Sequence, residues 1–100
     1  MSDAHTPPSG AAIDDTAVPK IAPGFKLQFE KAQDAWVLLY PEGMVKLNQS
    51  AGEIMQRCDG ERDVAAVVAT LEKAFEQEGL SDDVKAFLAI ASQQNWIRLD

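Results

Sequence analysis

The central part of the chain alternates apolar and polar residues in a way that predicts a small antiparallel sheet. Residues 25–29 place large apolar side chains at every second position, which is the period-two pattern of a half-buried strand. A second run at 35–40 is rich in aromatic and branched residues, and the polar stretch 31–34 between the two runs predicts a hairpin. A turn at 41–43 then leads to a third strand at 44–47.

After this sheet the apolar spacing changes to that of amphipathic helices, and three helices are expected. The first is short and is capped by Asn48 or by Ser50, which has a glutamate three residues later as in a capping box. The second begins after its cap Asp63 and ends at Gly79. The third begins at its cap Ser81, and two aspartates lie in its first turn, where the helix dipole favours negative charge.

Three strands followed by three helices predict an α+β fold like that of a winged helix-turn-helix, in which helices cover one face of a three-stranded antiparallel sheet. Residues 96–99 then form either a terminal strand or an extended arm on the core. The first 24 residues contain four of the five prolines and no aromatic residue, which is typical of disorder. We therefore expect a disordered tail or interdomain linker at 1–22 and one domain at 23–100.

The charge balance argues against nucleic acid as a partner. The chain has a net charge of −7, and the part after residue 24 carries 13 acidic against 8 basic residues. Such a surface repels phosphate, whereas nucleic-acid-binding domains concentrate lysine and arginine on one face. We also expect no membrane association, because no apolar run has the length of a signal peptide or a membrane span. A single cysteine suits a reducing cytoplasmic location.

Residues that carry chemistry are few. Cys58 is the single cysteine and His5 the single histidine, so the usual four-ligand zinc site is excluded and a cysteine nucleophile lacks a nearby base. Cys58 is better explained as a small apolar residue on the inner side of the first helix. We therefore expect no catalytic residue, no metal and no cofactor, and a binding protein rather than an enzyme. A small enzyme or a redox carrier that uses Cys58 is the alternative.

Two surfaces are candidates for binding. In a sheet of three sequential strands, 44–47 lies at an edge whose unpaired backbone groups can pair with a partner's strand, unless 96–99 or a loop covers it. The third helix is apolar over a wide arc, because Ile90 lies well round from Val84 and Leu88. That width suits a groove for a partner's side chains, a helix deep in the core, or a contact between two copies of the chain.

The segment from Trp36 to Gly60 resembles a known family. Its most characteristic part is the string Val-Lys-Leu-Asn-Gln-Ser-Ala-Gly-Glu-Ile-Met-Gln-Arg-Cys-Asp-Gly at 45–60, preceded by Trp-Val-Leu-Leu-Tyr-Pro-Glu-Gly at 36–43. A strand that ends in Leu-Asn, a short helix and a Cys-Asp-Gly stop are similar to the pattern of the PqqD proteins of pyrroloquinoline quinone (PQQ) biosynthesis. The resemblance extends from about Pro23 to Leu99.

This resemblance implies a domain that binds the precursor peptide PqqA and presents it to the radical S-adenosylmethionine enzyme PqqE. In the wider family the peptide adds as a strand to the third strand and lies against the third helix. A DNA-binding regulator and a dimerisation module with paired edges are the alternatives. Together with the two surfaces above, the resemblance predicts these peptide-binding residues, in which the two lysines meet acidic groups: Met44, Val45, Lys46, Leu47, Lys85, Phe87, Leu88, Ile90 and Ala91.

Overall fold

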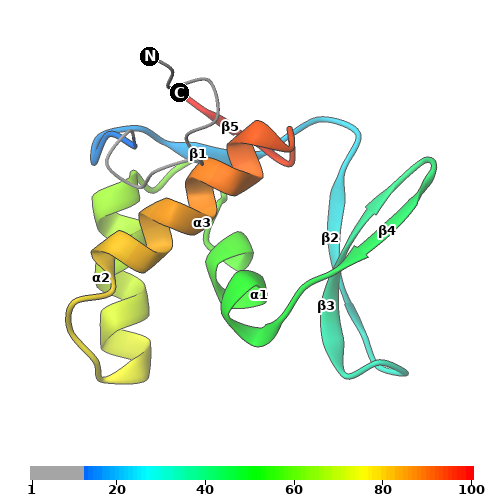
Figure 1. Ribbon diagram of the computed structural model, residues 1–100, viewed down its shortest axis with the longest axis horizontal. Coiled ribbons are helices and arrows are strands. Elements are labelled where there is room, and N and C mark those ends of the chain that lie inside the picture. The colour runs from blue at the N-terminus through cyan, green and yellow to red at the C-terminus, as the bar shows by residue number, and fades with distance from the viewer. Residues whose placement is uncertain (1–12) are drawn as a thin grey trace, which may run out of the picture.

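A computed structural model describes residues 13–100, and Figure 1 shows their arrangement. A three-stranded antiparallel sheet with the order β2-β3-β4 lies beside three helices, and a second sheet pairs β1 with β5, which confirms the predicted α+β class and winged helix-like order. None of the helices in residues 13–100 has the length and apolar composition that a membrane span requires. The elements are β1 (Pro19–Ile21), β2 (Lys26–Glu30), β3 (Ala35–Tyr40), β4 (Gly43–Lys46), α1 (Gln49–Gln56), α2 (Val64–Phe75), α3 (Ser81–Gln93) and β5 (Ile97–Leu99).

The register of the sheet confirms the predicted hairpin. Leu38 of β3 lies opposite Leu27 of β2 and Val45 of β4, and its side chain is completely buried. These three residues share the face that packs on the helices, because side chains opposite one another in a sheet point to the same side. Helix α1 approaches this face closely, since a Cβ atom on Gly52 would lie 3.1 Å from Trp36. The glycine therefore allows α1 to lie directly on the sheet.

Two predicted helix caps are confirmed. The Asn48 side chain accepts a hydrogen bond from the Ala51 N–H at 2.8 Å, so Asn48 rather than Ser50 caps α1. Asp63 caps α2 in the same way and accepts from the Ala66 N–H at 2.8 Å. Each cap gives a partner to an N–H group that has none within its own helix.

The end of α2 differs from the prediction. The helix stops at Phe75 rather than at Gly79, because Glu76 adopts the left-handed conformation with φ of 51°. The Glu76 N–H bonds back to the carbonyls of Glu72 and Lys73, which closes the last turn. Gly79, with φ of 76°, instead bends the connection that leads to α3.

The start of α3 also differs from the prediction. Ser81 is the first helical residue, and Leu80 holds the cap position without a side-chain hydrogen bond. The Leu80 N–H donates to the Glu72 carboxylate of α2 at 3.1 Å. A contact between two helices therefore fixes this start, and such a contact has no local signature in the sequence.

Residues 13–22 belong to the folded structure, although their composition predicted a disordered tail. β1 pairs antiparallel with β5, and Ile13 is buried in the core. The strand escaped prediction because it begins with Pro19, which is tolerated at the first position of a strand but reads as a linker residue. The predicted disorder of residues 1–12 lies outside the described residues.

The N-terminal segment also supplies partners to the start of α2. The Val64 N–H donates to the Ala17 carbonyl at 2.8 Å, and the Ala65 N–H donates to the Asp15 carbonyl at 3.0 Å. The Asp15 carboxylate forms an ion pair with Lys85 of α3. Residues 13–22 therefore connect β5, α2 and α3, and their removal would leave helix N–H groups without partners.

Cys58 lies in the core, as its place on the inner side of the first helix predicted. Its side chain is 3% exposed, and its thiol donates to the Ile54 carbonyl at 3.4 Å. Burial, together with the nearby charge of Asp59, raises the pKa of the Cys58 thiol to about 12. The thiolate that a nucleophile requires is therefore scarce at neutral pH.

Deletion of residues 1–22 is expected to destabilise the domain relative to a chain that begins at residue 13. The shorter chain loses β1, buried Ile13 and two capping hydrogen bonds, and each cap alone is worth about 1 kcal/mol. We expect the free energy of unfolding, measured with urea, to fall by at least ~2 kcal/mol. Equal values for the two chains would contradict a structural role for residues 13–22.

The free energy of unfolding is expected to fall as the pH rises from about 9 to about 12. The unfolded Cys58 thiol loses its proton near its ordinary pKa of 9.0, whereas the folded thiol keeps its proton up to about 12, so high pH favours the unfolded state. The Cys58→Ala variant lacks this group and should show a smaller fall. Urea unfolding of both chains on either side of the ordinary thiol pKa measures the difference, and an equal fall in both would show that the thiol is not its cause.

Candidate functional site

β4 leaves one edge of the three-stranded sheet open. It pairs with β3, and no described strand pairs with its other side. The Leu47 N–H donates to the Trp36 carbonyl at 3.0 Å, so these opposed residues form a hydrogen-bonded pair. Bonded and non-bonded pairs alternate along an antiparallel ladder, which directs the backbone groups of Met44 and Lys46 away from β3. The N–H and C=O groups of these two residues are therefore available to another strand.

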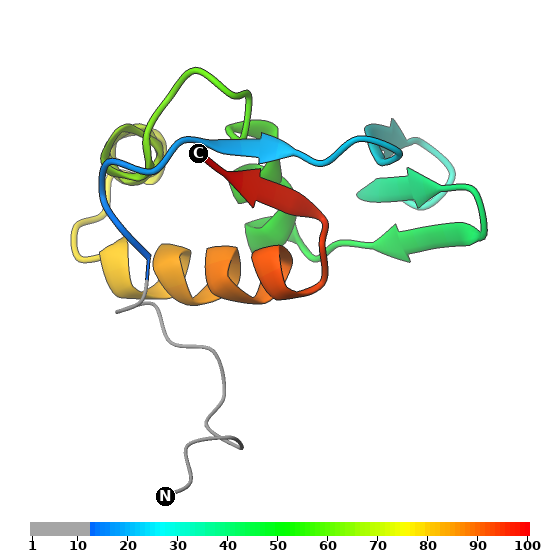
Figure 2. The same ribbon diagram turned by 90° about the horizontal axis from the view of Figure 1, so that it is seen from above.

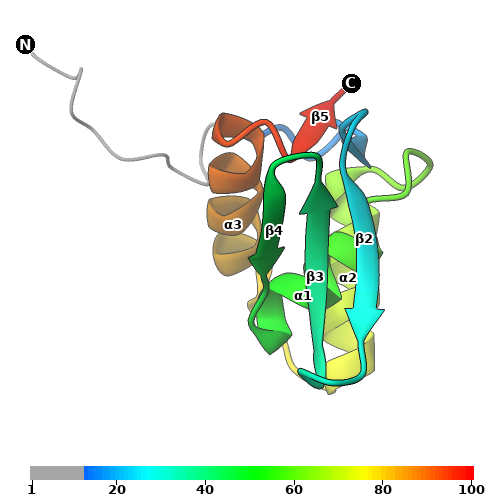
Figure 3. The same cartoon turned by 90° about the vertical axis from the view of Figure 1, so that its right-hand side faces the viewer.

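Residues 96–99 do not cover this edge. Their strand, β5, pairs with β1 in a separate two-stranded sheet. Figure 3 looks onto the three-stranded sheet and shows β5 beyond the ends of its strands. Of the two arrangements that the sequence left open, the structure contains the one with an open edge.

The open edge lies on the α3 side of the molecule. Figures 2 and 3 both place β4 on the side of the sheet where α3 lies, with β3 on the far side of β4. Val45 and Leu47 direct their side chains toward the helices, where Leu47 is buried. Met44 and Lys46 direct theirs to the outer face of the sheet, and Met44 is 47% exposed. A strand added to β4 therefore lies on the side of α3.

The predicted apolar residues of α3 divide into exposed and buried ones. Ile90 is 43% exposed and Phe87 is half-buried, so both reach the surface. Leu88 and Ala91 are completely buried and belong to the hydrophobic core. Periodicity placed all four in one broad apolar arc, whereas packing against the neighbouring elements separates them. The exposed apolar face of α3 is formed by Phe87 and Ile90.

The two lysines of the predicted site lie in different surroundings. Lys46 is exposed at the open edge of β4. Lys85 forms an ion pair with Asp15 of the N-terminal segment, and only 18% of its side chain is exposed. Lys46 is therefore accessible to an acidic group at the edge, whereas Lys85 would first have to leave Asp15.

Phe75 is exposed although it belongs to the apolar stripe of α2. Its side chain is 43% exposed and borders a hollow of about 230 Å³ where α1, α2 and α3 meet. Phe75 continues the apolar spacing of α2, but it lies one turn beyond buried Leu71, where the core ends. We call this space the apolar hollow, and its apolar lining includes Ile54, Leu71, Phe75, Leu80, Val84 and Phe87.

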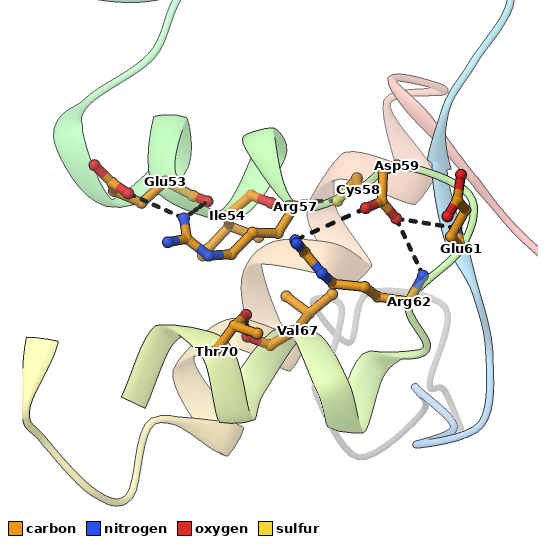
Figure 4. A network of polar contacts seen from close by, with 9 residues as sticks. All are labelled: Glu53, Ile54, Arg57, Cys58, Asp59, Glu61, Arg62, Val67 and Thr70. Atoms are coloured by element: carbon orange, nitrogen blue, oxygen red, sulfur yellow. Dashed lines mark hydrogen bonds and ion pairs between the residues drawn. The ribbon is translucent and has the colours of Figure 1, made fainter. Parts of the chain in front are cut away.

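Polar side chains between α1 and α2 bond to one another and to the nearby backbone (Figure 4). The Arg57 guanidinium donates to the Glu53 carboxylate at 3.0 Å and to the Glu53 carbonyl at 2.8 Å. The Asp59 carboxylate accepts from the N–H groups of Glu61 and Arg62, and these bonds hold its pKa below the usual value. These groups stabilise the connection between the helices. Within residues 13–100, no three histidine, cysteine or acidic side chains are grouped to hold a metal ion.

Comparison with known protein sequences identifies relatives over most of the chain. The family model of coenzyme PQQ synthesis protein D (PqqD) matches residues 35–97. A PqqA binding protein of Pseudomonas aeruginosa is 58% identical over 84 residues, which are 83% of this chain and 91% of that protein. A PqqA binding protein of Kluyvera intermedia is 49% identical over 87 residues, which are 86% of this chain and 95% of that protein.

A solved structure shares the fold. It is the solution NMR structure of the PqqD truncation of Methylobacterium extorquens PqqCD, a stand-alone recognition element for ribosomally synthesized and post-translationally modified peptides. The two structures align with a TM-score of 0.74 over 89% of this chain and 97% of that chain, at 23% sequence identity. The family model matches most of the length of the chain, and the PqqA binding protein of Pseudomonas aeruginosa is 58% identical to it. The chain therefore belongs to the PqqD family.

Proposed function

We propose that this protein is a peptide-binding adaptor of PQQ biosynthesis, which binds the precursor peptide PqqA and presents it to the radical S-adenosylmethionine enzyme PqqE. The observation that carries the proposal is the open edge of β4 on the side of the sheet where α3 lies (Figure 3), together with the exposure of Ile90 and Phe87 on that helix. Relatives that are named PqqA binding proteins support the choice of peptide. A role in binding rather than catalysis agrees with the protonated, buried thiol of Cys58.

The peptide binds as an additional strand on β4. Met44 and Lys46 each offer an outward N–H and C=O, which pair with the peptide backbone and fix its register. Successive side chains of a strand point to opposite faces, so every second peptide side chain turns toward the helices and meets Phe87 and Ile90. Backbone pairing supplies affinity that does not depend on the peptide sequence, and the apolar contacts with α3 supply selectivity.

Apolar contact is the largest side-chain contribution to affinity in this arrangement. A backbone hydrogen bond replaces bonds to water and contributes about 0.5–1.5 kcal/mol net. An exposed ion pair between Lys46 and an acidic peptide residue contributes only about 0–1 kcal/mol. Full burial of one large apolar side chain contributes about 1.5–3 kcal/mol. Ile90, which is 43% exposed in the protein alone, therefore gains burial when the peptide covers it.

An adaptor of this kind promotes a reaction without performing it. By holding PqqA near PqqE, it raises the local concentration of the substrate for the enzyme. This function needs two surfaces, one for the peptide and one for PqqE, but no cofactor and no catalytic group of its own. Because a precursor peptide made by ribosomes is released in the cytoplasm, we place the adaptor there.

The DNA-binding alternative gains no support from α3. In a winged helix-turn-helix regulator, a helix enters the major groove and basic residues contact the phosphates. The first turn of α3 instead carries Asp82 and Asp83, and Lys85 is paired with Asp15. Negative charge at this position repels a phosphate backbone, so peptide binding is the better explanation of the exposed helix face.

Addition of PqqA to the isotope-labelled protein is expected to shift the backbone amide resonances of β4 and α3. These elements carry the edge groups and the apolar face that the peptide covers. An NMR titration that follows all assigned amides measures the effect. Shifts confined to β1, β5 or the turn between β2 and β3 would contradict the proposed site.

The substitution Ile90→Asp is expected to weaken PqqA binding by about tenfold or more while the domain stays folded. It places a charge where the peptide would bury apolar side chains, at a residue that the core does not need. Phe29→Asp is the matched control, because Phe29 is also 43% exposed but lies on β2, at the opposite edge of the sheet. Calorimetric titration measures binding, and thermal unfolding followed by circular dichroism checks the fold. Equal losses of affinity in both variants, or unfolding of the Ile90→Asp variant, would overturn the assignment.

A further inference from the structure

The apolar hollow is open to the surface on one side of the helices. Its lining residues Ile54 and Leu71 are buried core residues, 7% and 2% exposed. Phe75 at its border is 43% exposed, so a large apolar side chain beside the hollow is in contact with water. The hollow therefore leaves apolar surface in contact with water that an apolar occupant would cover.

We propose that the apolar hollow is a subsite for one large apolar or aromatic side chain of the peptide that pairs with β4. This inference rests on the proposed function and adds a second point of recognition to it. The subsite receives a residue that flanks the paired segment of the peptide rather than one within it. The subsite thereby distinguishes PqqA from other extended peptides, which pair equally well with an open strand edge.

The hollow is continuous with the proposed strand-addition site. Phe87 lines the hollow and also forms the exposed apolar face of α3. Asn48, which lines the hollow as well, follows β4 after a single intervening residue. A peptide that pairs with β4 and continues past Lys46 therefore reaches Asn48 and then Ser50, another lining residue.

The volume of the hollow selects a side chain rather than a small-molecule ligand. Sites for drug-sized ligands measure about 300–1,000 Å³, whereas this hollow measures about 230 Å³. An apolar cavity of ~150 Å³ in another protein admits benzene, so the space is sufficient for one aromatic ring. A phenylalanine, tyrosine, leucine or methionine side chain fits these limits.

The charges around the hollow favour an uncharged occupant. Its lining residues include one acidic residue, Asp83, and no lysine or arginine. An acidic peptide side chain would meet repulsion from Asp83 and no compensating positive charge. A basic side chain would pair with Asp83 but would leave the apolar walls exposed, including Phe75 and Ile54. A large apolar side chain contacts the apolar lining residues and leaves Asp83 in water.

The first test removes the exposed wall of the hollow. Phe75→Ala is expected to weaken binding of a synthetic PqqA peptide to the full chain by about tenfold, measured by calorimetric titration. Phe29→Ala is the matched control, because the two phenylalanines are equally exposed at 43% and Phe29 does not line the apolar hollow. This control should bind within about twofold of the unsubstituted chain.

The second test fills the hollow without touching the core. Ser50 is exposed on the first turn of α1, so Ser50→Leu directs extra volume into the hollow while the fold is kept. It is expected to weaken binding about as much as Phe75→Ala. Alanine substitution of each large apolar peptide residue then identifies the occupant, because one peptide variant should lose its sensitivity to Phe75→Ala.

The outcomes separate this inference from the proposed function. If Ile90→Asp weakens binding but Phe75→Ala and Ser50→Leu do not, strand addition stands and the subsite is wrong. If Phe75→Ala reduces affinity only in proportion to a loss of folded protein and Ser50→Leu has no effect, the subsite is also wrong. If the unsubstituted chain does not bind PqqA, both proposals fail. Weakened binding in both hollow variants, with one peptide position insensitive to Phe75→Ala, establishes the subsite.

Discussion

The Val18 N–H donates a hydrogen bond to the Asp100 carbonyl at 2.9 Å, and the Asp100 N–H donates one to the Val18 carbonyl at 3.1 Å. With the pairing of β1 and β5, these bonds join the two ends of the described chain. Because β5 pairs with β1, it does not pair with β4, and the edge of the three-stranded sheet stays open. The same N-terminal segment bonds to the start of α2, and its Asp15 forms an ion pair with Lys85 of α3.

An open edge strand is a hazard as well as an opportunity, because it also pairs with wrong partners. β4 limits this hazard by its length of four residues and by the exposed charge of Lys46. Such a short edge gives few backbone hydrogen bonds, so selective binding needs side-chain contacts beside it. Phe87 and Ile90 of α3 supply an apolar surface for those contacts. The proposed function therefore needs the edge and the helix together.

Most of the fold was predictable because the signals involved act between neighbours in the chain. Alternation marked β2, aromatic and branched residues marked β3, and a turn marked the start of β4. The caps Asn48 and Asp63 marked the starts of α1 and α2. β1 was not predictable, since it begins with a proline and its partner β5 lies at the other end of the chain. For the site, periodicity identified a broad apolar arc on α3 but could not separate Leu88 from Ile90. Packing of α3 on α2 and β5 makes that separation.

Hydrogen exchange at the edge of β4 tests the central claim most directly. In the protein alone, the Met44 and Lys46 amides point away from β3 and should exchange quickly, whereas the Val45 amide is bonded to β3 and should exchange slowly. Strand addition gives the outward amides partners in the peptide backbone. We expect binding of PqqA to slow exchange at Met44 and Lys46 by about tenfold or more, with a much smaller change at Val45. Unchanged exchange at Met44 and Lys46 in the saturated complex would contradict peptide binding by strand addition.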